Sequence, residues 1–234
     1  MQAQAAATAR GSPTIMAAKK RIGILISGRG SNMVSLIEAA RLPDYPVEIA
    51  CVVSNRPDAA GLDRARAEGI PAIAIDHKLF PSREAFEAEL DAALRGAGVE
   101  LVVCAGFMRK MTAGFVESWR DAMLNIHPSL LPSFKGLDTH ARALAAGVKV
   151  AGCTVHVVRP ELDSGPIVAQ AAVPVLDGDT EESLAARVLA AEHRLYPHAL
   201  KLFASGGAVI SGERVEADQG LVNPADPLFW PPLD

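Results

Sequence analysis

An asparagine and a histidine separated by one residue stand before a proline, in the segment Asn125-Ile126-His127-Pro128. The residues before them are apolar, and the strand period of two places Asn125 and His127 on one face, with Ile126 on the other. An amide donor beside an imidazole can stabilise an oxyanion and move a proton, which acyl transfer requires. The alternative is a histidine that only caps its own loop.

A carboxylate that can serve this pair is Asp163, in the polar turn of residues 161–166 between two apolar segments. If this turn folds over the end of the sheet, Asp163 pairs with His127 and favours the imidazolium form. Otherwise, Asp163 is an ordinary turn residue. The spacing along the chain leaves both interpretations open.

The second motif is a glycine-rich turn at residues 27–32 (SGRGSN), between an expected strand and an expected helix. Glycines bring backbone N–H groups close to an anion, and a helix N-terminus adds a partial positive charge. The third glycine of a dinucleotide fingerprint is replaced by Met33, and the Gly-Lys-Ser/Thr ending of a P-loop is absent. The turn therefore indicates a phosphate site of another kind, or a purely structural turn.

Other chemistry has weaker support. Ser129, Ser133 and His140 raise the question of a serine hydrolase, but the chain has no Gly-x-Ser-x-Gly elbow. No metal site is expected, because the six histidines lack ligand spacing with cysteines or acids. An odd number of well-separated cysteines in apolar runs indicates small buried side chains in a reducing compartment. These are Cys51, Cys104 and Cys153.

Short apolar runs alternate with longer helical patterns, which predicts one α/β domain with a doubly wound, mainly parallel sheet and flanking helices. The expected strands are residues 22–26, 47–54, 72–75, 101–105, 123–127, 151–158 and 167–175. The expected helices are residues 32–40, 61–68, 82–94, 112–119, 139–146 and 181–204. The last helix should start near Asp179 and bend at Pro197. Because ligands of a parallel sheet sit at the C-terminal edge of its strands, Asn125 and His127 should face the crevice together.

Charge and hydropathy exclude several classes of function. With 23 Lys and Arg against 27 Asp and Glu, the net charge is -4, so no nucleic-acid partner is expected. Apolar runs are too short to span a bilayer, and a cytoplasmic protein is predicted, as a monomer or homodimer. Residues 1–19 are expected to be a disordered extension, with a transit peptide as the alternative, residues 20–205 the domain, and residues 206–234 a partly extended C-terminal extension.

Four segments together resemble the phosphoribosylglycinamide formyltransferase family, folate-dependent enzymes of purine synthesis. They are residues 24–32 (ILISGRGSN), 105–109 (AGFMR), 125–132 (NIHPSLLP) and 161–166 (ELDSGP). The third segment is shared by the wider formyltransferase superfamily, whereas the glycine-rich turn is similar to that of the glycinamide ribonucleotide enzymes. The resemblance covers about residues 20–204 and implies a Rossmann-like formyltransferase fold.

The resemblance also implies a reaction. The formyl group of 10-formyltetrahydrofolate, a co-substrate, would pass to the amine of 5-phosphoribosylglycinamide in purine (IMP) biosynthesis, by direct attack through a tetrahedral intermediate and without a metal. Catalytic roles fall to Asn125, His127 and Asp163. The ribonucleotide phosphate would bind Gly30, Ser31 and Asn32, and Glu192 matches an acid near the substrate, unless it is merely an exposed helix residue. The implied folate-binding residues are Arg83, Met108, Arg109, Lys110, Met111 and Asn125.

Two departures from the family pattern fall in the expected folate loop: Pro160 replaces a frequent acid, and Ser164 replaces a glycine. Two alternatives remain. One is a relative with another acceptor, such as methionyl-tRNA, a sugar amine, or water in a formyltetrahydrofolate hydrolase, although the tRNA enzyme and the hydrolase are expected to carry additional domains. The other is a non-catalytic nucleotide-binding module.

Overall fold

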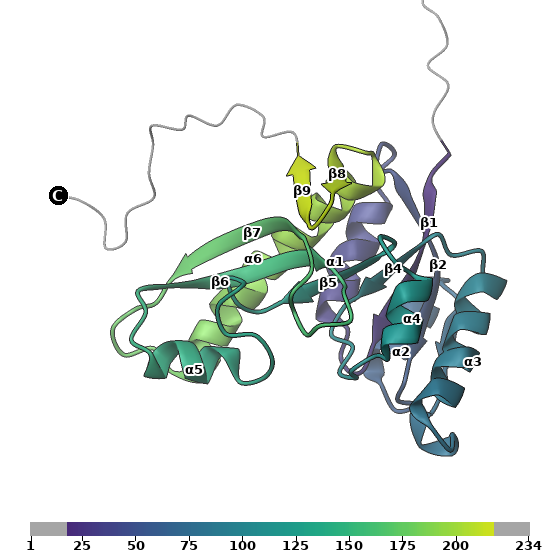
Figure 1. Cartoon of the computed structure of the whole chain (residues 1–234), viewed down its shortest axis with the longest axis horizontal. Helices are drawn as coiled ribbons and strands as arrows, with labels where there is room; N and C mark the ends of the chain where they lie inside the picture. Colours follow the sequence, from purple (N-terminus) through teal and green to yellow (C-terminus); the bar gives the residue numbers. More distant parts are fainter. Residues whose placement is uncertain (1–17, 218–234) are drawn as a thin grey trace, which may run out of the picture.

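The computed structural model describes residues 18–217, and its centre is a seven-stranded sheet (Figure 1). The strand order is β3-β2-β1-β4-β5-β6-β7. Neighbours from β3 to β5 are parallel, whereas β6 pairs antiparallel with both β5 and β7. The strands are β1 (Lys20–Ile26), β2 (Val47–Ser54), β3 (Ala72–Ala74), β4 (Leu101–Cys104), β5 (Met123–His127), β6 (Val150–Val157) and β7 (Ile167–Pro174).

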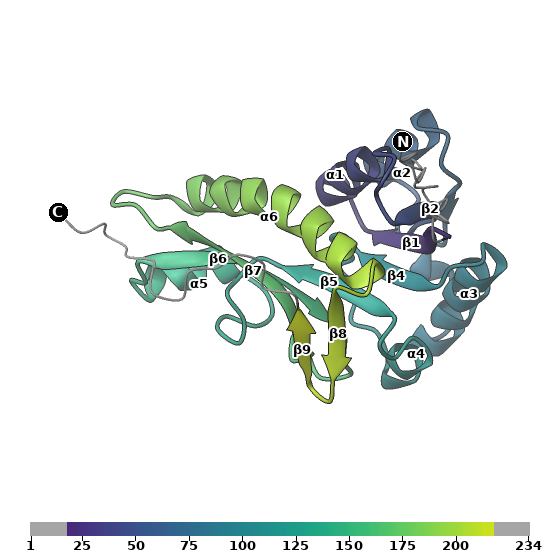
Figure 2. The ribbon, with the colours of Figure 1, turned by 90° about the horizontal axis from the view of Figure 1, so that it is seen from above.

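Helices cover both faces of the sheet and bury two separate apolar clusters (Figure 2). One face carries α1 (Ser31–Ala40), α2 (Ala60–Ala67), α5 (Thr139–Ala145) and α6 (Glu181–Ala204). The other face carries α3 (Arg83–Gly96) and α4 (Ala113–Ser118), and a short 3-10 helix spans His77–Leu79. The central strands are apolar on both sides because each side packs against helices. The expected single α/β domain with a doubly wound, mainly parallel sheet is confirmed.

The long helix α6 spans Glu181–Ala204, as the sequence predicts. Its N-cap is Thr180, which exchanges capping hydrogen bonds with Ser183, while Asp179 lies one residue earlier and pairs with Arg187. The helix also continues through Pro197 to Ala204, and its axis bends along its length in Figure 2. Tyr196 fixes it to the sheet, because its hydroxyl lies 2.9 Å from the carbonyl oxygen of Cys104.

The three cysteines are free and buried, as expected, and each lies on a different strand: Cys51 on β2, Cys104 on β4 and Cys153 on β6. Burial raises the pKa of the Cys51 thiol to about 11 and the pKa values of Cys104 and Cys153 to about 12. These thiols are therefore protonated near neutral pH.

A hairpin that the sequence analysis did not predict follows α6. Strands β8 (Ala208–Ser211) and β9 (Arg214–Ala217) pair antiparallel around a two-residue turn, where Gly212 has a φ of 62°. Ala208 is buried in the main core, and Val215 packs against it. Part of the region expected as an extension is thus ordered structure, whereas residues 1–17 and 218–234 lie outside the described chain.

Candidate active site

Asn125 and His127 lie at the carboxyl end of β5, in the middle of the sheet. Asn125 is flanked in register by Cys104 on β4 and by His156 on β6. Both side chains face the α3–α4 side, while Leu124 and Ile126 belong to the cluster on the opposite side. The strand period therefore places the amide and the imidazole as expected, and His127 is 6% exposed.

The polar turn that carries Asp163 folds over the end of the sheet. Asp163 Oδ2 lies 3.4 Å from His127 Nδ1 and accepts a hydrogen bond from the Gly136 backbone N–H at 2.9 Å. The Asp163 side chain is 9% exposed, and its φ of 46° is in the left-handed region that non-glycine residues rarely adopt. An ordinary surface turn does not fit this burial and contact. The structure instead joins the carboxylate to the imidazole.

Two oxygen atoms from loops surround the ring of His127. Its Nε2 lies 3.1 Å from the carbonyl oxygen of Phe134, and its Nδ1 faces the Asp163 carboxylate. Both neighbours are hydrogen-bond acceptors, so the two ring nitrogens of His127 face a carbonyl oxygen and a carboxylate.

His156 is a site residue that sequence reasoning missed. It is 2% exposed, and its Nε2 lies 3.2 Å from Asn125 Nδ2 and 3.8 Å from Asp163 Oδ1. Its Nδ1 lies 3.1 Å from the Val157 carbonyl oxygen, and burial lowers its pKa, so the neutral ring donates from Nδ1 and accepts at Nε2. One N–H of the Asn125 amide is thereby held, and the amide keeps a second N–H. His156 looked like strand interior in the sequence, and only the pairing of β5 with β6 reveals its contact.

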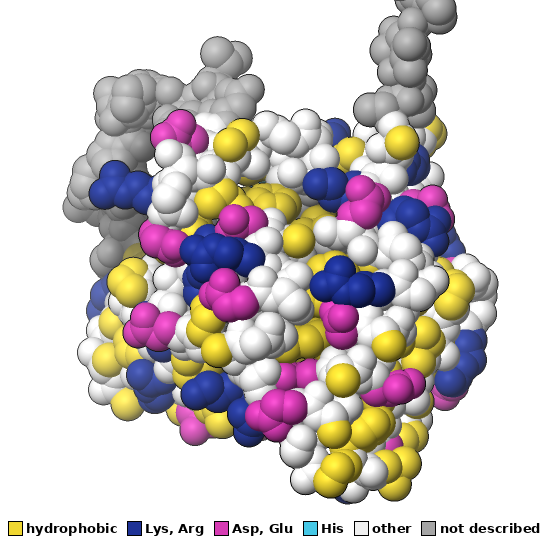
Figure 3. Space-filling view, turned by 45° about the vertical axis from the view of Figure 1, so that its right-hand side comes forward, with side chains coloured by type: hydrophobic (Ala, Val, Ile, Leu, Met, Phe, Trp, Pro, Cys, Tyr) yellow, Lys and Arg dark blue, Asp and Glu magenta, His cyan; other side chains and the backbone are white. Residues whose placement is uncertain are grey.

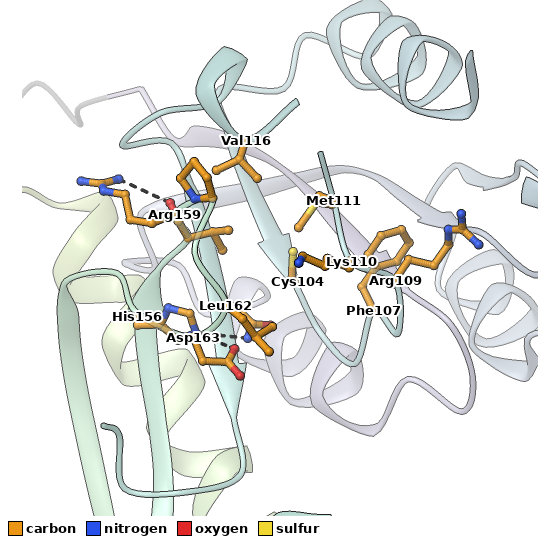
Figure 4. A pocket seen from close by; sticks show the side chains of 13 residues that line it. Cys104, Phe107, Arg109, Lys110, Met111, Val116, His156, Arg159, Leu162 and Asp163 are labelled. Atoms are coloured by element: carbon orange, nitrogen blue, oxygen red, sulfur yellow. Dashed lines mark hydrogen bonds and ion pairs between the residues drawn. The ribbon is translucent and has the colours of Figure 1, made fainter. Parts of the chain in front are cut away.

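A cavity opens beside these groups, with Asp163, His156 and Leu162 on one side and Lys110, Arg109 and Phe107 on the other (Figure 4). The expected folate residues Arg109, Lys110, Met111 and Asn125 line it. His127 does not, because Asp163 and Phe134 cover its two ring nitrogens. The cavity measures about 120 Å³, and the loop that carries Leu162 and Asp163 forms part of its wall.

Two expected folate residues lie elsewhere. Met108 is 70% exposed and borders a neighbouring cleft of about 580 Å³, which shares Arg109 with the smaller cavity. Arg83 is the exposed first residue of α3 and lines neither space. The order of residues in a motif does not reveal which side chains point into the same space.

The glycine-rich turn has the geometry expected of an anion site. Gly30 adopts a φ of 70° and precedes α1, whose first turn receives no side-chain cap in the described chain. Free N–H groups at a helix start and the helix dipole attract anions. Asn32 does not extend into solvent, because its Nδ2 donates to Glu192 Oε2 at 2.7 Å. Its Oδ1 is buried without a hydrogen-bond partner among the described residues.

Glu192 is 6% exposed, so the alternative of an exposed helix glutamate is wrong. Burial raises its pKa above 4.5, and the Asn32 amide only partly opposes this. The structure therefore joins Glu192 to the glycine-rich turn. Neither lines the cavity beside Asn125.

Side-chain hydrogen bonds hold the segment that lines the cavity, and one of them connects it to the glycine-rich turn. Ser27 accepts a hydrogen bond from the Met108 N–H at 2.8 Å and donates to Asn55 at 2.5 Å. At the other end of the segment, the buried Glu87 carboxylate accepts hydrogen bonds from the backbone N–H and the hydroxyl of Thr112. The segment between Gly106 and Thr112 is thus held at both ends.

On the face shown in Figure 3, acidic and basic side chains are interspersed.

Within residues 18–217, no helix is long and apolar enough to cross a membrane.

These features define an α/β protein with polar residues gathered where its parallel strands end, the usual place for a ligand in such folds. The formyl transferase family matches residues 20–200, and the chain belongs to this family. The resemblance carried by the four motifs is confirmed.

Two groups of relatives match. The chain is 48% identical over 206 residues to the trifunctional purine biosynthetic protein adenosine-3 of Bos taurus, covering 88% of this chain but 20% of that protein. It therefore spans about a fifth of the length of such relatives. It is 44% identical over 185 residues to the phosphoribosylglycinamide formyltransferase of Escherichia coli, covering 79% of this chain and 87% of that one.

Two solved structures have folds similar to that of this chain. Glycinamide ribonucleotide transformylase 1 from Symbiobacterium toebii superposes with a TM-score of 0.83 at 50% identity, covering 85% of this chain and 94% of that chain. A formyltetrahydrofolate deformylase from Pseudomonas syringae has a TM-score of 0.80 at 26% identity, covering 86% of this chain and 67% of that chain.

Proposed function

We propose that this chain transfers the formyl group of 10-formyltetrahydrofolate to the amine of 5-phosphoribosylglycinamide, a step of purine biosynthesis. The observation that carries the proposal is the contact of Asn125, His156, Asp163 and His127 at the end of β5, in a chain of the formyl transferase family. The alignment covers 87% of the Escherichia coli enzyme and 94% of the Symbiobacterium toebii chain, both of which are named for this reaction.

Asn125 is assigned to the oxyanion. The substrate amine attacks the formyl carbon, and negative charge develops on the formyl oxygen as the tetrahedral intermediate forms. The Asn125 amide, held by His156 on one N–H, has a second N–H to donate to this oxygen.

His127 and Asp163 are assigned to charge and proton transfer. The imidazolium stabilises the oxyanion once the Phe134 carbonyl releases its N–H, and the Asp163 carboxylate maintains the charged ring. A water beside Asp163 relays the proton from the attacking amine to the folate nitrogen that leaves. No covalent intermediate with the protein is required, because two aligned substrates react directly.

The two substrates are assigned to different parts of the crevice. Backbone N–H groups of Gly30, Ser31 and Asn32 would hold the ribonucleotide phosphate, with Glu192 beside them. Arg109, Lys110 and Met111 would border the folate. Arg83 and Met108 would contact the part of the folate outside the cavity.

The test is a spectrophotometric transfer assay with 10-formyl-5,8-dideazafolate and glycinamide ribonucleotide, run beside a His127→Ala control. Turnover that requires both substrates and is lost in the variant supports the proposal. Consumption of the folate analogue without ribonucleotide indicates a hydrolase, the activity named for the Pseudomonas syringae neighbour. Binding of the analogue without consumption indicates another acceptor, whereas no binding favours a nucleotide-binding module. Sedimentation checks the expected monomer or homodimer, and the cytoplasmic location stays a prediction.

A further inference from the structure

The loop between β6 and β7 carries Asp163 and part of the cavity wall, and its base is closed tightly. The Val157 N–H donates to the Pro166 carbonyl across the base at 2.8 Å. Gly165 lies so close to β6 that a Cβ there would collide with the Val157 carbonyl oxygen, and it also borders the aliphatic part of Arg159. The aliphatic part of Arg159 therefore lies next to the returning chain of the loop at Gly165.

The guanidinium of Arg159 leaves the loop and meets two carboxylates from other parts of the fold. Its Nη2 lies 2.7 Å from Asp121, in the turn before β5, and its Nε lies 3.2 Å from Glu213, at the tip of the β8–β9 hairpin. The Arg159 side chain is only 7% exposed, although Glu213 is 64% exposed. Glu213 also reaches Arg120 at 3.4 Å, so one carboxylate connects two arginines.

The hairpin tip is held in place by its own geometry. Gly212 is the first residue of the two-residue turn and has a φ of 62°, an arrangement that favours tight hairpins. Val215 and Ala217 pack against the main core, so the tip is attached to the body of the protein. This hairpin lies beyond residues 20–200, which the family match covers.

We propose that Glu213 is a positioning residue: through Arg159, the hairpin tip fixes the base of the loop that presents Asp163 to His127 and closes over the folate. The inference rests on the proposed function for the identity of the folate. A fixed base raises the population of the closed loop, and apparent affinity for a ligand that binds the closed form scales with that population.

The test compares Glu213→Ala with Glu216→Ala, a matched control on the same hairpin that is exposed and makes no described ion pair. Glu213→Ala should raise the KM for the formyl donor about two- to fivefold, the range of a partly exposed ion pair, and leave the KM for the ribonucleotide unchanged. Removing both acceptors with Asp121→Ala and Glu213→Ala should raise it more than tenfold, because Arg159 then lies buried without a carboxylate. Glu216→Ala should match the parent.

A double-mutant cycle separates action through Arg159 from a general loss of stability. In an Arg159→Ala background, Glu213→Ala should change the donor KM by less than twofold, whereas independent effects would multiply and overturn the proposal. Hydrogen exchange of the peptide spanning residues 157–166 should quicken in Glu213→Ala but not in Glu216→Ala. The hydrogen-exchange rate can be measured without catalysis. A parent chain without transfer activity would therefore refute the proposed function alone. An unchanged exchange rate in Glu213→Ala would refute the positioning role of Glu213.

Discussion

The two halves of the candidate site are built in different ways. The half proposed to bind the ribonucleotide, called the ribonucleotide half, joins Asn32 in the first turn of α1 to Glu192 in the middle of α6, so both side chains are fixed by helices. The formyl half joins the end of β5 to two loops, in which Phe134, Asp138 and Asp163 adopt positive φ angles. Binding groups are thus placed by regular elements, whereas the groups assigned to chemistry depend on loops.

The two kinds of support differ in how easily they move. Helices that share a packed core open only with the fold, but loops open locally at low cost. A loop forms part of the wall of the cavity beside Asn125, whereas the Asn32–Glu192 pair joins two helices. We expect substitutions in the formyl half to change kcat and the KM for the formyl donor. Substitutions in the ribonucleotide half should change the Kd for the ribonucleotide.

The largest expected effect comes from His127→Ala. Loss of the imidazolium should lower kcat about 10²- to 10⁴-fold, because it removes a proton-transfer group and a charge beside the oxyanion. The ribonucleotide half is untouched, so calorimetry should give an unchanged Kd for glycinamide ribonucleotide. A comparable loss of that affinity would contradict both the role of His127 and the separation of the two halves.

Gly165→Ala is expected to have the next largest effect. A methyl group at this position collides with the Val157 carbonyl oxygen and displaces the loop that carries Asp163. Overpacking of this kind costs about 1–3 kcal/mol. If this energy displaces Asp163 from His127, kcat/KM falls about 5- to 150-fold. Gly96→Ala is the matched control, since the α3 glycine has open space around it. Equal effects of the two substitutions would show that loop placement is unimportant.

Asn32→Ala sharpens the comparison from the other half. The change removes the hydrogen bond to Glu192 and leaves a buried carboxyl without its amide partner. We expect the Kd for glycinamide ribonucleotide to rise about tenfold, equivalent to about 1.4 kcal/mol, with a smaller change in kcat. Calorimetry and saturation kinetics measure both values. Unchanged affinity would contradict a role of the Asn32 side chain and its Glu192 contact in ribonucleotide binding.

The smallest expected effect is a pH dependence of stability. Burial raises the pKa of Glu192 above 4.5, so the folded chain binds this proton more tightly than the unfolded chain. The free energy of unfolding contributed by Glu192 therefore falls as pH rises above 4.5, by at most about 1.4 kcal/mol per pH unit. Glu192→Gln lacks this dependence and should gain stability relative to the parent over that range. Urea denaturation at a series of pH values measures it, and a constant difference would contradict the burial argument.

The strands were predicted to within about two residues because those buried on both faces read as continuous apolar runs bounded by turn residues. Asn125, His127 and Asp163 were identified because polar groups at the ends of apolar strands are conspicuous. The β8–β9 hairpin was missed since its strands are short and their packing depends on a surface formed elsewhere. His156 and the place of Arg83 were missed for a related reason: strand register and helix orientation decide them, and neither is a local property of the sequence.

The three buried thiols can report where the sheet opens locally. Cys51, Cys104 and Cys153 lie on three different strands, Cys51 and Cys153 each next to an edge strand and Cys104 at the centre of the sheet, and none reacts while its strand is packed. A maleimide can therefore modify each thiol only when that part of the protein opens, and its labelling rate gives the free energy of that opening. Mass spectrometry of the three cysteine peptides would then rank these three strands of the native protein by local stability, without any engineered cysteine.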